Sequence, residues 1–585
     1  MSGAVPPRLL SIVALALIWW PGWISVSPAA TPPSVVFAYD VRIPMRDGAT
    51  LSADVYRPDT NQKVPVILVR TPYDNGVAAQ VAAGKWWAAR GYAYVVQDVR
   101  GRGESDGEFY PLVHEAEDGD DTIRWCGTQA WSNGKVGMTG SSYLGWTQLY
   151  PAGMKNPSLA ALFTIVAPPD PYRNFPMQLG VLSPPTVSWL VNTAGRTLQD
   201  ISEHDLASVY QTLPLRDMDE KLGRHIKAWK DWVDHPTLDD YWKQQAFQER
   251  MLGATVPVYH VSGWYDDVLV GTLENYVALA TRATDIAERE RQWLLIGPWG
   301  HGVNRSTRMG AIDFGTDAVI DLNGLQLRWF DHWLKGIDNG IEREPHVKLF
   351  MMGENQWRTE REFPMARTVA TKYYLHSNGR ANSLFGDGTL SMSAPTTDEP
   401  VDRFRYDPMN PVPFITEPDF HQIGGPDDYQ AVERRDDVLV YTTDAVAAPV
   451  EVCGLLRATL YAASSARDTD WTMKLLDVHP SGFAQRLNDG IVRARFRKGY
   501  DRQVLLTPGS VEQYELDLWG TCTRLASGHR LRVEVSSSAF PKFDRNLNTG
   551  GPLGKESSGG VASQTIYHDR AHPSHIVIPR LPIRK

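Results

Sequence analysis

The sequence contains one short motif that could supply a reactive serine. Residues 140–145 are Gly-Ser-Ser-Tyr-Leu-Gly, between a strand-like run at residues 135–139 and a helix-compatible stretch that begins at Trp146. With Ser142 at the apex the motif fits G-x-S-Y-x-G, in which the glycines let a strand turn sharply into a helix. Such a turn exposes Ser142 as a nucleophile and leaves Ser141 as the variable position.

A serine hydroxyl is a weak nucleophile at neutral pH, so Ser142 needs a histidine base and a carboxylate that orients the base. In an α/β-hydrolase these partners follow the serine in the order Asp, then His. Two later apolar runs, at residues 256–267 and 293–301, end in glycine and a polar residue of this kind. Because the carboxyl ends of parallel strands form the free edge of an open sheet, we assign Asp266 and His301 as the partners.

Other residues compete for both roles. His260 lies inside the same apolar run as Asp266, so we interpret it as a buried core residue, whereas His301 follows a Gly-Pro-Trp-Gly segment just beyond a strand. Asp267 is adjacent to Asp266, and sequence spacing does not separate the two. With His301 as base, we expect activity to fall in acid as the imidazole is protonated, with an apparent pKa of about 6 to 7.

Five motifs occur together and in order along the chain. They are Arg-Thr-Pro-Tyr-Asp at residues 70–74, Asp-Val-Arg-Gly-Arg-Gly-Glu-Ser-Asp-Gly at 98–107, the serine motif at 140–145, Gly-Trp-Tyr-Asp at 263–266 and Gly-Pro-Trp-Gly-His at 297–301. In these motifs the chain resembles the X-Pro dipeptidyl-peptidase and cocaine-esterase family of serine hydrolases, over nearly all of its length after the first thirty-odd residues. The resemblance implies Ser142 as nucleophile, His301 as base and Asp266, not Asp267, as its orienting acid.

The resemblance also implies an oxyanion hole made by the backbone N–H of Tyr143 and the hydroxyl of Tyr73. A tetrahedral intermediate carries negative charge on oxygen, and each fixed donor there lowers the activation free energy by about 3 kcal/mol. Tyr73 follows the apolar run at residues 64–70, in the loop where such a donor belongs. We interpret residues 98–107 as a tight loop that supports the site without taking part in the chemistry.

The sequence implies no metal and no cofactor. The acidic run at residues 115–121 lacks the spacing of an EF-hand loop, and we interpret it as the solvated start of a helix that ends near Trp125. The chain has no H-E-x-x-H, no C-x-x-C pair, no P-loop and no G-x-G-x-x-G after a strand. Its net charge of -9 argues against nucleic acid and anionic membranes as partners. A small acyl compound is the partner we expect, and the oligomeric state stays open.

The first thirty residues have the pattern of a secretory signal peptide. Arg8 precedes the apolar run at residues 9–20, a Pro-Gly pair then interrupts it, and small residues near Ala29 and Ala30 offer a cleavage site. The apolar run ends before the roughly 20 residues that a membrane span needs. We therefore expect export to the periplasm or the medium, with an uncleaved anchor as the alternative.

Length and patterning predict several domains. The chain has 585 residues, of which 42% are hydrophobic, and this is enough for more than one core. Strands alternating with helices predict an α/β-hydrolase sheet over residues 31–168 and 251–355, interrupted by a helical cap at residues 169–250. Alternating apolar residues between turns predict an all-β sandwich at residues 360–585, which the resemblance identifies as a jelly roll.

The chain has three cysteines, too few for a disulfide framework. Cys126 belongs to the helix before the serine motif and is expected to pack as a small apolar residue. Cys453 and Cys522 lie in strand-like segments of the sandwich region and could pair if those strands are neighbours.

Two classes of function remain. The first is a serine hydrolase that cleaves an acyl ester, with X-Pro dipeptidyl-peptidase or amide cleavage as the alternative on the same residues. The second is a surface-binding protein that uses the sandwich and has lost catalysis. Because no member of the Ser142, Asp266 and His301 set is missing, we favour catalysis. A peptidase or amino-ester hydrolase needs a cluster of carboxylates to bind the free ammonium of its substrate. The sequence offers only Asp267 for this purpose, so we favour cleavage of an ester without an ammonium group.

Overall fold

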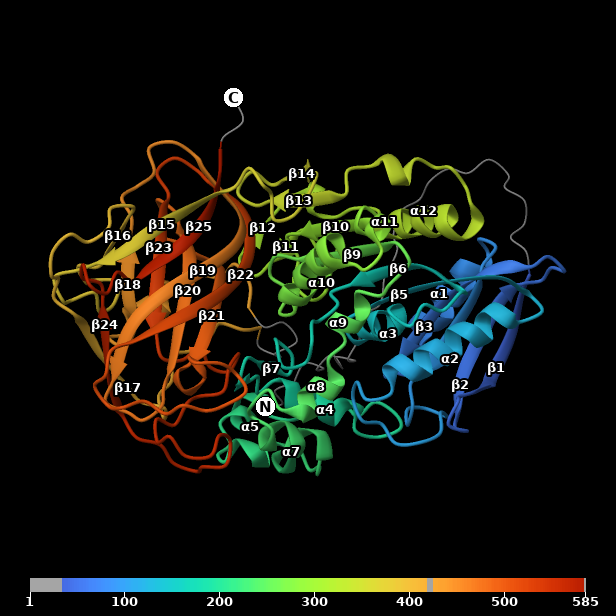
Figure 1. Ribbon diagram of the computed structural model, residues 1–585, viewed down its shortest axis with the longest axis horizontal. Helices are drawn as coiled ribbons and strands as arrows, with labels where there is room; N and C mark the ends of the chain where they lie inside the picture. The colour runs from blue at the N-terminus through green and yellow to red at the C-terminus, as the bar shows by residue number, and fades with distance from the viewer. Residues whose placement is uncertain (1–33, 418–423, 583–585) are drawn as a thin grey trace, which may run out of the picture.

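The computed structural model describes residues 34–417 and 424–582, so the predicted signal peptide at residues 1–30 lies outside the described residues. Figure 1 shows a helix-covered sheet on one side of the molecule and an all-β lobe on the other, with a group of short helices below their junction. None of the helices in the described ranges has the length and apolarity required to span a bilayer.

The sheet of the first lobe has ten strands in the order β1-β2-β4-β3-β5-β6-β9-β10-β13-β14. Neighbours from β4 to β13 are parallel, whereas β1, β2 and β14 add antiparallel edges. The central strands are buried along their length because helices cover both faces. The strands are Val35–Pro44, Thr50–Pro58, Val64–Thr71, Ala93–Asp98, Ser132–Ser141, Leu159–Ile165, Val258–Gly263, Gln292–Gly297, Val347–Met351 and Gln356–Glu360, for β1 to β6, β9, β10, β13 and β14.

This mixed, mostly parallel sheet confirms the predicted α/β-hydrolase fold class. The covering helices include α1 (Ala78–Ala88), α2 (Glu115–Thr128), α3 (Tyr143–Ala152), α10 (Leu269–Arg282) and α12 (Leu322–Lys335). Short connections after β5, β9 and β10 leave the sheet at one edge, because these strands run parallel and lie within four consecutive positions of the sheet. The residues assigned from sequence follow these three strands.

Three acids of the run at the start of α2, Glu115, Asp118 and Asp120, are buried, so the prediction of a solvated helix start was wrong for them. Glu115 forms an ion pair of 2.7 Å with Arg70, and Asp118 forms one of 2.6 Å with Arg100. Asp120 accepts from Arg46 at 2.6 Å. These arginines lie up to 74 residues before their partners. The ion pairs therefore hold α2 against segments from earlier in the chain.

The segment between β6 and β9 contains six short α-helices joined by irregular stretches. The two-residue strands β7 (Met177–Gln178) and β8 (Val181–Leu182) form a small hairpin there that the pattern did not reveal. The α-helices are Thr186–Thr193, Leu206–Tyr210, Met218–Lys221, Lys227–Asp234, Asp240–Gln245 and Gln248–Met251, for α4 to α9.

The second lobe is an all-β domain of eleven strands, as predicted, and its pairing is antiparallel apart from one contact between β16 and β18. In the first part of β22 the alternation is clear, since Tyr514 and Leu516 are buried between more exposed residues. The strands are Val369–His376, Thr389–Ser391, Asp402–Tyr406, Leu439–Thr442, Val450–Ser464, Asp470–Val478, Ala484–Arg493, Glu512–Leu525, Arg530–Ser536, Ala562–Tyr567 and His575–Leu581, for β15 to β25.

Cys453 and Cys522 form a disulfide, which resolves the pairing that the sequence left open. They face each other because β19 and β22 are antiparallel neighbours with these two residues in register. The bridge closes a separation of 69 residues and so restricts the unfolded chain. Cys126 is fully buried in α2, as expected of a small apolar residue.

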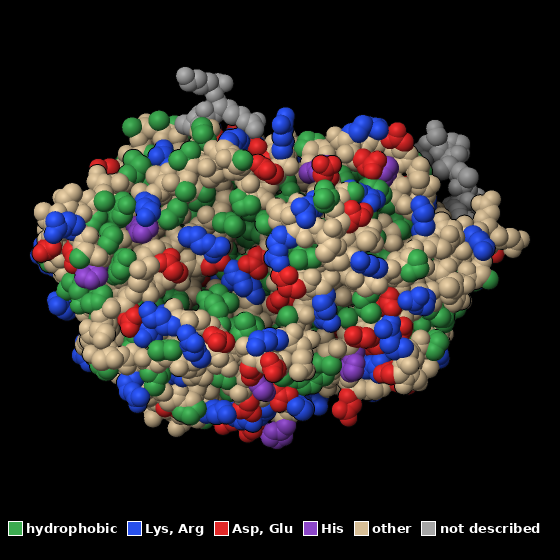
Figure 2. Space-filling view, viewed as in Figure 1, with side chains coloured by type: hydrophobic (Ala, Val, Ile, Leu, Met, Phe, Trp, Pro, Cys, Tyr) green, Lys and Arg blue, Asp and Glu red, His purple; other side chains and the backbone are tan. Residues whose placement is uncertain are grey.

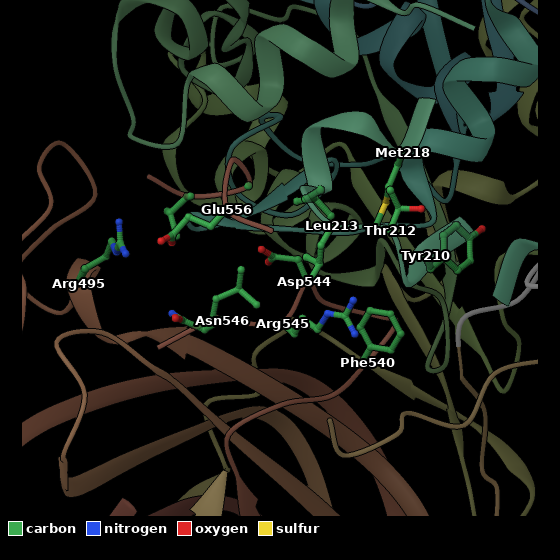
Figure 3. A pocket seen from close by; sticks show the side chains of 14 residues that line it. Tyr210, Thr212, Leu213, Met218, Arg495, Phe540, Asp544, Arg545, Asn546 and Glu556 are labelled. Atoms are coloured by element: carbon green, nitrogen blue, oxygen red, sulfur yellow. The ribbon is translucent and has the colours of Figure 1, made fainter. Parts of the chain in front are cut away.

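The helical segment contacts the β lobe around a small cavity of about 30 Å³. Figure 3 shows Tyr210, Leu213 and Met218 on one side of it and Arg545 beside Phe540 on the other. Arg545 donates to the side chain and the backbone oxygen of Gln211, at 2.5 Å each. On the face shown in Figure 2, charges of both signs are interspersed.

Candidate active site

Ser142 sits at a sharp turn between β5 and α3. Its backbone has φ 62° and ψ -121°, a strained combination for a residue with a side chain. Its N–H donates to the carbonyl of Ile165 at 2.9 Å, which fixes the turn against β6. A Cβ at Gly145 would lie 2.7 Å from that of Ala167, and one at Gly140 would lie 2.4 Å from that of Leu144. The motif therefore needs both glycines, as the sequence predicts.

The hydroxyl of Tyr73 faces Ser142. It hydrogen-bonds the Ser142 side chain and accepts a hydrogen bond of 3.0 Å from the indole N–H of Trp189, a residue of α4. Burial raises the pKa of Tyr73 to about 12. The phenol thus keeps its proton at neutral pH and can donate a hydrogen bond beside Ser142.

Tyr143 is the first residue of α3, so its backbone N–H has no acceptor within the helix. Its side chain is turned away into the core, where the hydroxyl donates to Glu115 at 2.7 Å and accepts from the N–H of Leu112 at 3.1 Å. Only the backbone of Tyr143 is therefore placed to act at the turn.

The loop at residues 98–107 supports the Tyr73 segment, as we predicted. The buried guanidinium of Arg102 donates to the carbonyl of Pro72 and to that of Thr193, at 2.6 Å each. Asp98 accepts from the N–H of Asn75 at 2.9 Å. This loop joins the Tyr73 segment to α4, the helix that supplies Trp189.

Asp266 and His301 form a hydrogen-bonded pair. The Nδ1 atom of His301 lies 2.9 Å from Oδ1 of Asp266, which is completely buried. Asp266 accepts a second bond of 2.6 Å from the Ser262 hydroxyl and a third of 3.2 Å from the N–H of Val268. The carboxylate is thus held in place and fixes the orientation of the imidazole through Nδ1.

Asp267 also contacts His301, at 3.2 Å from Nδ1. Burial acts to lower the pKa of His301, but the combined attraction of Asp267 and Asp266 outweighs it and raises the pKa to about 10. The shift is upward because two carboxylates contact the ring, and the apparent pKa of about 6 to 7 for activity stays a prediction. Burial opposes ionisation of Asp267 as well, yet the charge of His301 lowers its pKa.

A buried lysine from the β lobe approaches the same place. Lys542 is paired with Asp489 at 2.7 Å, and Asp267 is among the charges that act on it. Burial lowers the pKa of Lys542 to about 8, against the attraction of Asp489. The loop between β23 and β24 therefore brings positive charge towards the Asp267 and His301 pair.

His260 is a core residue, as the sequence indicates. It is fully buried in β9, its Nε2 lies 3.2 Å from the side-chain oxygen of Gln292, and burial lowers its pKa to about 4. The imidazole of His260 is thus enclosed in the sheet and engaged with Gln292. The choice of His301 over His260 is therefore consistent with their surroundings.

Sequence reasoning missed three side chains around the site. The contact of Asp267 with His301 was not foreseen, and no motif in the sequence pointed to Trp189, which is partly exposed and donates a hydrogen bond to Tyr73. Lys542 had no sequence signal. Asp266, Asp267 and His301 also lie close enough together to hold a metal ion, although the Nδ1 proton that links them would have to leave first.

Comparison with known proteins agrees with this architecture. The sequence profile of the X-Pro dipeptidyl-peptidase (S15 family) matches residues 47–303, and that of the X-Pro dipeptidyl-peptidase C-terminal non-catalytic domain matches residues 339–577. A cocaine esterase from Rhodococcus sp. (strain MB1 Bresler) is 37% identical over an alignment of 572 positions, which covers 93% of this chain and 98% of that protein.

Two solved structures share the whole architecture. An α-amino acid ester hydrolase has 26% identity and a TM-score of 0.82, covering 95% of this chain and 98% of its own. An aminopeptidase from a marine sediment archaeon, Thaumarchaeota archaeon, has the same identity and TM-score, covering 95% and 99%. These relatives are esterases and peptidases, so the class of surface-binding proteins is not supported. The chain belongs to the S15 family of serine hydrolases, the X-Pro dipeptidyl-peptidase and cocaine-esterase family.

Proposed function

We propose that this protein is a secreted hydrolase of carboxylic esters that works through an acyl-enzyme on Ser142. His301 takes the proton of the Ser142 hydroxyl as it attacks the ester carbonyl, and returns it to the leaving alcohol. Asp266 orients the imidazole. The N–H of Tyr143 and the hydroxyl of Tyr73 donate to the oxyanion, and water then releases the acid by the same steps.

The observation that supports this most is the convergence at the Ser142 turn. Support comes from the strained backbone at Ser142 and from the neighbouring Tyr73, whose phenol is protonated. Further support comes from His301, which is paired with Asp266 and follows β10, three strands along the sheet from β5. Nucleophile, oxyanion donor and oriented base thus come from separate elements at one sheet edge. In this proposal residues 31–168 and 251–355 form the catalytic domain, 169–250 the cap and 360–585 the jelly roll.

Charge favours an ester over a substrate with a free ammonium. A peptidase or amino-ester enzyme needs a carboxylate that can pair with the substrate ammonium. Asp267, the extra carboxylate beside the pair, already contacts His301 and lies in the field of Lys542. Asp267 is therefore already engaged with a cationic group of the protein and is less available to a substrate ammonium. Cleavage of X-Pro peptides or amides is the second candidate, because the family profiles have that description.

The substrate class is tested by comparing p-nitrophenyl butyrate with Gly-Pro-p-nitroanilide. We expect kcat/KM for the ester to exceed that for the anilide by several orders of magnitude. Ser142→Ala should abolish both activities, which excludes a contaminating enzyme. Faster turnover of the anilide would overturn the ester assignment and leave the serine mechanism in place.

Export is supported by the disulfide between Cys453 and Cys522, since such bonds persist in oxidising compartments. Expression of the full chain with its own N-terminus, followed by sequencing of the exported protein, tests the proposal. We expect the mature protein to begin after Ala29 or Ala30. Recovery of the intact N-terminus in the membrane fraction would identify an uncleaved anchor instead.

A further inference from the structure

The β lobe contains a second cluster of chemically active side chains, away from Ser142. Asp477 lies at the end of β20, His479 directly follows that strand, and His529 directly precedes β23. Because β20 and β23 are antiparallel, with Val478 paired to Arg530, the two histidines come together just beyond the last pair. Their rings lie 4.4 Å apart at an angle of 37°.

Three donors converge within this cluster. The Nδ1 atom of His529 lies 2.8 Å from Oδ1 of Asp477. Asp477, His479 and His529 each offer one ligand atom, and these atoms all lie within 4.8 Å of one another. Asp477 is buried, whereas the His529 side chain keeps 16% of its surface exposed, so an ion could enter from solvent.

Gln485 adds a fourth donor with a fixed orientation. It stands opposite Asp477 in the register of β20 and β21, and its Oε1 lies 3.2 Å from Nε2 of His479. Its Nε2 donates to the hydroxyl of Tyr265 at 3.1 Å. Because one end of the amide is used as a donor to Tyr265, the carbonyl end faces the histidines.

An ion pair between Asp477 and His529 does not account for the whole cluster. Such a pair needs one imidazole, and a second protonated imidazole at this separation would repel the first. A divalent cation uses both rings in their neutral form. Two imidazole nitrogens with one carboxylate and one amide oxygen suit zinc and the late first-row metals, whereas calcium and magnesium prefer sites made of oxygen alone.

We propose that Asp477, His479 and His529, with Gln485 as a fourth donor, form a binding site for a divalent transition metal ion such as Zn²⁺. The ion would join the β20–β21 hairpin to the start of β23. Loops at that edge of the lobe would then be held by a metal bridge. This inference does not depend on the catalytic assignment, since none of the four residues belongs to it.

The test uses the full chain without an affinity tag, treated with EDTA and then dialysed. Titration calorimetry with ZnCl₂ is expected to show one site per chain, and neither MgCl₂ nor CaCl₂ should compete for it. The double variant His479→Ala with His529→Ala should weaken binding at least about tenfold. Asp477→Asn nearly preserves the shape of the side chain, and it should also weaken binding. This single variant tests the site even if the double variant fails to fold.

Two matched controls locate the site. His225→Ala removes an exposed histidine that also has an acidic neighbour, Glu220, and should bind Zn²⁺ as the wild type does. His301→Ala removes the other cluster in the described residues that could hold an ion, and it should also leave the affinity unchanged. Loss of binding only in His301→Ala, unchanged binding in the Asp477 and double variants, or no zinc binding by the wild type would each overturn the proposal.

Discussion

Asp267→Asn should move the acidic limb of the pH–rate profile to lower pH. In the wild type the base holds its proton strongly, because two carboxylates contact Nδ1 of His301, at 2.9 Å for Asp266 and 3.2 Å for Asp267. Two unit charges 3.2 Å apart interact by about 5 kcal/mol at an effective dielectric constant of about 20. At about 1.4 kcal/mol per pKa unit, this energy corresponds to at most about 4 units.

The expected shift is smaller than this ceiling. The Asp267 side chain is 22% exposed, so water screens part of its charge, and Asp266 remains in place. We expect the apparent pKa in kcat/KM to fall by about 1 to 3 units. Since only the neutral imidazole accepts a proton, each unit raises the active fraction about tenfold at a pH below both pKa values.

The assay is hydrolysis of p-nitrophenyl butyrate by wild type and variants from pH 5 to 10, corrected for spontaneous hydrolysis. Asp240→Asn is the matched control, because Asp240 is an exposed residue of α8, and its profile should equal the wild-type one. Asp266→Asn should instead lower kcat at every pH, by about 10⁴-fold, because the imidazole loses its oriented tautomer. An acidic limb that stays in place or moves to higher pH in Asp267→Asn would refute the two-carboxylate reasoning.

Three further predictions concern other parts of the molecule. Tyr73→Phe removes an oxyanion donor and should lower kcat by about 10² to 10³ with little change in KM; steady-state kinetics within threefold of the wild type would count against this role. Trp189→Phe removes one neutral hydrogen bond to Tyr73, of about 1 kcal/mol, so kcat should fall only about fivefold. A larger loss of kcat than for Tyr73→Phe would contradict the proposal that Tyr73 is the oxyanion donor and Trp189 only its support. Replacing both Cys453 and Cys522 by alanine should lower the free energy of unfolding by about 2 to 5 kcal/mol, measured by urea denaturation, and unchanged stability would contradict it.

Much of the architecture could be predicted because its signals are local. The serine turn depends on glycines within three residues of Ser142, and the parallel strands are apolar runs of adequate length. The rule that strand ends share an edge points to His301 and to the neighbours Asp266 and Asp267, between which the family resemblance chose Asp266. The alternation in β22 likewise marks the sandwich, since one face of that strand is buried.

The remaining features depend on contacts between distant segments. The sequence predicts solvent exposure for the acids of α2, yet three of them form ion pairs in the interior with Arg46, Arg70 and Arg100. Trp189 reaches Tyr73 across 116 residues, and Lys542 comes from another lobe. Asp267 was visible beside Asp266, but only the backbone turn after β9 brings both carboxylates to His301.

The central claim is that Ser142 is the nucleophile, and labelling with a fluorophosphonate tests it most directly. Intact mass spectrometry should show one adduct per chain, and peptide mapping should place it on Ser142. Ser142→Ala should remain unlabelled, whereas Ser141→Ala, the matched neighbour, should label as the wild type does. An unlabelled wild type, equal labelling of Ser142→Ala, or an adduct on another serine would contradict the account.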